Sequence, residues 1–108
     1  MRYDMTFLIG RLEFVGPFRS GSEISARPGL FAILCETNEE FELLEIDHCE
    51  NLSSCLDNDE YVSNLSFYQE NCSGSLCAAV YYTDQLTKKE RSQLRDELLA
   101  AVRNEEAA

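Results

Sequence analysis

The chain has 108 residues, which is the length of one modest domain with a single core. Its composition, 44% hydrophobic and 27% charged, is that of an ordinary globular protein and excludes a disordered or fibrous chain. A formal net charge of -11 argues against nucleic acid as a partner, because phosphate is bound through clustered cations. The apolar runs are too short to span a membrane and no export signal precedes them, so we expect a cytoplasmic protein.

The amino-terminal segment Met5 to Phe14 is strongly apolar and predicts an early strand or a short helix, ended by Gly16 and Pro17. A polar loop over Ser20 to Ser25 follows. Leu30 to Cys35 then predicts a strand that is apolar at both parities, as is typical of a central strand covered on both faces.

The middle of the chain predicts a hairpin and a short helix. A loop at Thr37 to Glu40 leads into a second strand from Phe41 to Ile46. Leu52 and Leu56 are one turn apart, which favours a short helix over Asn51 to Leu56. The segment from Glu60 to Gly74 is left unassigned: Tyr61, Leu65 and Tyr68 have helical spacing, but Asn71, Ser73 and Gly74 indicate a loop.

The carboxy-terminal third predicts a strand and a long helix. Leu76 to Thr83 alternates and is rich in Val and Tyr, so it reads as a strand. Thr87 with Glu90 matches a capping box, which predicts a helix from Thr87 to about Asn104. That helix should dock on the sheet through an apolar stripe formed by Leu94, Leu98, Ala101 and Val102.

The same helix carries four basic residues, Lys88, Lys89, Arg91 and Arg95. Because Glu90, Asp96 and Glu97 are interleaved with them, we expect an exposed, salt-bridged helix face, with a basic binding patch as the alternative. Together these elements predict an α/β (α+β) fold: a small, mainly antiparallel sheet with a short helix and a long carboxy-terminal helix packed on it. All 108 residues form one domain in this reading.

Two motifs carry a resemblance to a known family. The run Pro28-Gly29-Leu30-Phe31-Ala32-Ile33 resembles the first strand of GIY-YIG nuclease domains, and Leu44-Glu45-Ile46-Asp47 with Asn51-Leu52 and Leu56 resembles their second strand and following helix. The order of the elements agrees over about residues 24–100. The resemblance implies a GIY-YIG-like fold, with a cleft that in the family cuts a phosphodiester with the help of a divalent metal.

The resemblance places the family's functional groups at five positions of this chain, none of which keeps the expected residue: Phe31, Glu45, Asp47, Cys55 and Arg95. Phe31 has no hydroxyl with which to activate water, and Cys55 has no permanent positive charge for a phosphate. Arg95 would repel a metal ion. We therefore expect a domain that is no enzyme and has no cofactor or metal, and that uses these positions as a candidate binding cleft.

The expected partner is another protein, or a second copy in a homodimer, and the aromatic pair Tyr81 and Tyr82 offers a second surface because strand alternation should turn one ring away from the core. The alternative function is a divergent metal-dependent nuclease with a rebuilt site, in which Glu90 or Glu97 would be the metal ligand.

The five cysteines, Cys35, Cys49, Cys55, Cys72 and Cys77, are expected to be mostly buried, reduced thiols, because their number is odd and no leader is present. The alternative is a small zinc or thiol protein. Its zinc would be bound by His48, Cys49, Cys55 and either Cys72 or Cys77, although the chain contains no closely spaced cysteine pair.

Overall fold

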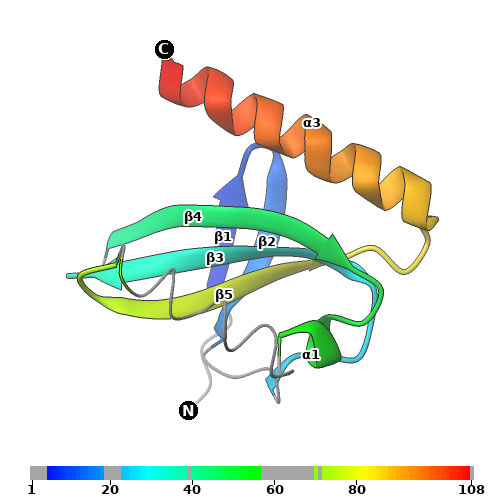
Figure 1. Cartoon of the computed structure of the whole chain (residues 1–108), viewed down its shortest axis with the longest axis horizontal. Helices are drawn as coiled ribbons and strands as arrows, with labels where there is room; N and C mark the ends of the chain where they lie inside the picture. Colours follow the sequence, from blue (N-terminus) through cyan, green and yellow to red (C-terminus); the bar gives the residue numbers. More distant parts are fainter. Residues whose placement is uncertain (1–4, 19–22, 39, 57–69, 71, 108) are drawn as a thin grey trace.

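Five antiparallel strands form one sheet in the order β1-β2-β5-β3-β4. The computed structural model describes residues 5–18, 23–38, 40–56, 70 and 72–107. Its elements are β1 (Met5–Ile9), β2 (Leu12–Phe18), β3 (Gly29–Thr37), β4 (Glu40–Cys49), α1 (Leu52–Cys55), β5 (Ser75–Tyr82) and α3 (Lys88–Ala107). Figure 1 shows the β1–β2 hairpin crossing the direction of the other three strands, so that the sheet is curled. The predicted α+β class is confirmed.

The sheet is covered on both faces, as the pattern of β3 predicted. On one face α3 packs over a cluster that includes Phe14, Leu30 and Ile46, and on the other α1 closes a second cluster with Phe31 and Ile33. Seven consecutive residues of β3, from Gly29 to Cys35, are buried. β3 is thus the centre of the fold, and residue parity along β3 and β4 decides which face a side chain serves.

Both helices begin where the sequence indicates. Thr87 Oγ1 accepts a hydrogen bond from the Glu90 amide at 3.1 Å, and the Thr87 amide donates to Glu90 Oε1 at 2.9 Å, which is the predicted capping box. The Asn51 side chain accepts from the Ser54 amide and caps α1. The predicted stripe docks α3, since Leu94, Leu98 and Val102 pack into the first cluster.

The amino-terminal expectation was wrong in two respects. Met5 to Phe14 is two strands, because Gly10, with φ of 61°, makes a tight turn inside the apolar run. The second strand also continues through Gly16 and Pro17 to Phe18, and the β2–β5 register shifts between Val15 and Phe18. This irregular stretch of the ladder accommodates a proline, which has no amide hydrogen to donate.

The remaining strands and the short helix lie where expected, and two of the strands, β3 and β4, are longer than predicted. β3 extends the predicted Leu30–Cys35 at both ends, and β4 continues three residues past Ile46 to Cys49. Most of the unassigned segment from Glu60 to Gly74 lies outside the described residues.

The expectation of reduced thiols was wrong for four cysteines. Cys35 forms a disulfide with Cys72, and Cys49 forms one with Cys55, while Cys77 is buried and belongs to neither pair. The first joins the end of β3 to the segment before β5, and the second fixes α1 to the end of β4. Among the described residues, no helix is long and apolar enough to cross a membrane.

Candidate functional site

The positions that the family resemblance singles out lie around β4, and the structure brings only some of them together. In the β3–β4 ladder Phe31 is opposite Asp47 and Ile33 is opposite Glu45, so Phe31, Glu45 and Asp47 share the α1 face of the sheet. Phe31 is 8% exposed and belongs to the apolar cluster beneath α1. It therefore contributes to the packing beneath α1.

Glu45 and Asp47 each bind the backbone of the next residue. Glu45 Oε1 accepts from the Ile46 amide at 3.2 Å, and Asp47 Oδ1 accepts from the His48 amide at 2.8 Å. On an edge strand every second amide faces away from the neighbouring strand and needs another acceptor. Within the described part of the chain β4 pairs only with β3, so these two carboxylates satisfy amides of the edge at this point.

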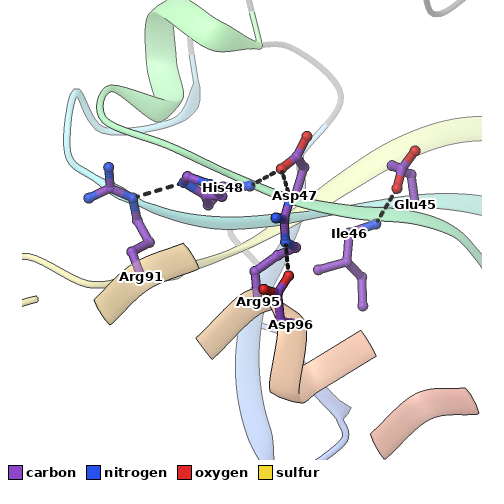
Figure 2. Close-up of polar contacts among 7 residues, drawn as sticks. All are labelled: Glu45, Ile46, Asp47, His48, Arg91, Arg95 and Asp96. Atoms are coloured by element: carbon purple, nitrogen blue, oxygen red, sulfur yellow. Dashed lines mark hydrogen bonds and ion pairs between the residues drawn. The ribbon is translucent and has the colours of Figure 1, made fainter. Parts of the chain in front are cut away.

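Asp47 also meets Arg95, although the two residues are far apart in the sequence. Arg95 comes from α3, on the other face, and its Nη1 lies 2.7 Å from Asp47 Oδ1 across the edge strand (Figure 2). Arg95 Nε donates to Asp96 at 2.9 Å as well. Two of the five candidate positions thus form an ion pair with each other. Cys55, by contrast, forms the disulfide with Cys49 that joins α1 to the end of β4.

A second contact between β4 and α3 lies beside this ion pair. Arg91 Nε donates to His48 Nδ1 at 3.3 Å (Figure 2). Arg91 is only 3% exposed, and its Nη2 has no hydrogen-bond partner among the described residues. The predicted exposed helix face is therefore wrong for Arg91, which is buried against the sheet.

The surroundings of His48 are cationic. Burial lowers the pKa of His48 below its ordinary value, and the charges of Arg95, Arg91 and Lys88 lower this pKa further, whereas Asp47 opposes them. Lys88, Arg91 and Arg95 follow one another at helical spacings of three and four, which places them on one side of α3. The spacing can be read from the sequence, but the acidic residues interleaved with these cations led to the prediction of an exposed, salt-bridged helix face.

The zinc set proposed from the sequence is not assembled. Cys49 and Cys55 bond to each other, Cys72 bonds to Cys35, and His48 contacts Arg91. A thiolate is the form that binds zinc, so a cysteine in a disulfide cannot be a ligand. No group of three or more potential ligand residues gathers within the described ranges.

The aromatic pair lies at a hollow between β5 and α3. Tyr81 packs on the α3-face cluster and Tyr82 on the α1-face cluster, so the expectation that one ring turns away from the core was wrong. Both tyrosines line a cavity of about 320 Å³ together with Thr83, Asp84, Gln85 and Leu86. Arg27 stacks 3.9 Å from the centre of the Tyr82 ring and forms an ion pair with Asp84. These two contacts hold Arg27 against the end of β5.

Comparison of the chain with protein-family models, with curated proteins and with solved structures gave no match. The resemblance to GIY-YIG domains therefore rests on the motifs quoted above.

Proposed function

We propose that this chain is a catalytically inactive, GIY-YIG-like domain that acts by binding another protein. The Asp47–Arg95 ion pair is the observation that carries the proposal. Where the resemblance would place a close backbone approach and a metal carboxylate, this chain has an anion and a cation that neutralise each other. Such a pair leaves neither charge available to a metal or to a scissile phosphate.

The surface that best fits a protein partner is the first half of β4. Glu40 and Glu42 are exposed there, and the strand lies at the edge of the sheet within the described chain. The later half of the strand is already engaged, because Glu45 and Asp47 bind its own amides. An acidic strand edge in a protein of net charge -11 favours a partner that presents basic residues.

The inactive state is tested with a plasmid-nicking assay in Mg²⁺ and in Mn²⁺. We expect no cleavage above a buffer control. Robust cleavage that disappears in Glu97→Ala would overturn the proposal in favour of a nuclease with a rebuilt site, because Glu97 is the carboxylate on α3 that such a site would use.

The binding role is tested by affinity capture from the native host with wild-type protein and two variants. A Glu40→Lys/Glu42→Lys double variant should lose the captured partner, since it reverses the charge of the proposed edge. Glu13→Lys changes an exposed glutamate on β2, away from this edge, and should retain it. Equal capture by all three proteins would refute the assignment of the edge.

Two further expectations belong to this proposal. A homodimer would show as a concentration-dependent mass in sedimentation, whereas a monomer at every concentration excludes it. The second is the expected cytoplasmic location. The two disulfides argue against it, because disulfides are typical of oxidising compartments. Alkylation of thiols during lysis of the native host, followed by mass spectrometry, would show which pairs exist in the cell.

A further inference from the structure

Arg91 is a buried cation, and no carboxylate of the described residues pairs with it. Its only described side-chain hydrogen bond goes to the neutral acceptor His48 Nδ1, and its Nη2 is unpartnered within the described chain. Burying an unpaired charge is expensive, and native proteins usually place a counter-charge beside it. The nearest acid on β4, Asp47, is already bound to Arg95.

The contact with Arg91 also decides where His48 holds its proton. Because Nδ1 accepts the bond from Arg91, the neutral ring carries its hydrogen on Nε2. The ring is half-buried, and its Nε2–H is the ring donor that remains once Nδ1 accepts from Arg91. The low pKa of His48 keeps the ring in this neutral form near pH 7.

Lys88 adds an accessible positive charge at the same place. It is exposed, it begins α3 three residues before Arg91 and so lies on the same side of the helix, and its charge is the smallest of those that lower the pKa of His48. Lys88 and Arg91 are thus two cations around one neutral donor, and the single facing carboxylate, Asp47, is shared with Arg95. A small anion would offset this excess positive charge.

We propose that the end of β4 and the start of α3 form a binding site for a small oxyanion, the phosphate or carboxylate group of a ligand. His48 Nε2 and the Lys88 ammonium donate to the anion, and Arg91 supports them from beneath by orienting His48 and supplying charge. Figure 2 shows the Arg91–His48 contact next to the Asp47–Arg95 pair, in which Asp47 Oδ1 accepts both from Arg95 and from the His48 amide. This site is independent of the proposed protein partner on the first half of β4.

The test uses the pKa of His48, which NMR reports without ambiguity because the chain contains one histidine. Full-length protein is titrated with pH in sodium chloride, in sodium sulfate, which stands in for a phosphate group, and in sodium acetate, all at equal ionic strength. A bound anion faces the ring and should raise the pKa of His48 by about 0.5 units or more over the chloride value. A rise in sulfate alone identifies a phosphate-type ligand, and a rise in acetate alone identifies a carboxylate.

Two helix variants separate a site from general screening. Lys88→Ala should abolish the anion-dependent rise, while Lys89→Ala, the neighbouring exposed lysine that does not influence His48, should keep it. Both replace one lysine of the first turn by alanine, so their effects on the helix are matched. No rise in either anion, or the same rise in Lys88→Ala as in wild type, would overturn the proposal.

Discussion

Gly29 is a position at which the fold should tolerate a methyl group poorly. It begins β3 in the motif that opens the family resemblance, and it is buried against both β5 and α1. A Cβ at this position would overlap the Tyr81 carbonyl oxygen and lie 2.8 Å from Leu52 Cδ1. The first overlap is with backbone in the β3–β5 ladder, so no change of rotamer relieves it, and the second displaces a leucine that is fully buried.

We therefore expect Gly29→Ala to lower the free energy of unfolding by about 2–4 kcal/mol. Overpacking costs roughly 1–3 kcal/mol, and partial exposure of Leu52 adds a fraction of the roughly 1.5–3 kcal/mol that its burial contributes. Urea denaturation followed by circular dichroism measures the change, and Glu97→Ala on the exposed side of α3 should change it by less than about 0.5 kcal/mol.

A double variant resolves the two parts. In a Leu52→Ala background, Gly29→Ala should cost less than alone, because one of its two overlaps has been removed, but the Tyr81 part should persist. If Gly29→Ala has no more effect than Glu97→Ala, then β3, β5 and α1 are not packed as closely as described.

Two further predictions concern His48 and the disulfides. The folded state lowers the pKa of His48 below the ordinary 6.5, so the unfolded chain binds more protons, and the free energy of unfolding should fall as pH falls from about 6.5 toward the folded pKa. Urea denaturation measured at several pH values should show a shallower fall in the His48→Gln variant than in the wild type. The half-buried pair Cys49–Cys55 should be reduced by dithiothreitol before the pair Cys35–Cys72, whose cysteines are 2% and 7% exposed; alkylation and mass spectrometry at intermediate reductant would contradict this if both pairs opened together.

Local patterns predicted the elements whose signals lie close together in the chain. The capping box at Thr87 and Glu90, the stripe through Leu98, and the two-sided apolar pattern of β3 each depend on residues within a few turns or one strand. The β1–β2 hairpin was missed because its turn at Gly10 interrupts an apolar run without a polar residue cluster.

The cysteine pairs could not be predicted because tertiary structure decides them. Cys35 and Cys72 are separated by 37 residues and meet because β3 and β5 are neighbours, with Cys35 opposite Leu76. Counting cysteines gave no information about that adjacency.

At the candidate site, too, the residue types can be read from the sequence, whereas the contacts between them depend on tertiary structure. The family resemblance predicted that Asp47 and Arg95 would oppose phosphodiester cleavage, and the structure makes them partners of each other. With side chains about a quarter and a half exposed, this ion pair contributes no more than about 1 kcal/mol to stability, so stability alone is a weak reason for its presence. Its larger effect is electrostatic: Asp47, the carboxylate beside His48, is bound to Arg95, and Arg91 has no carboxylate partner among the described residues. The two residues on which the proposal of an inactive domain depends therefore lie beside a cationic position in an otherwise acidic protein.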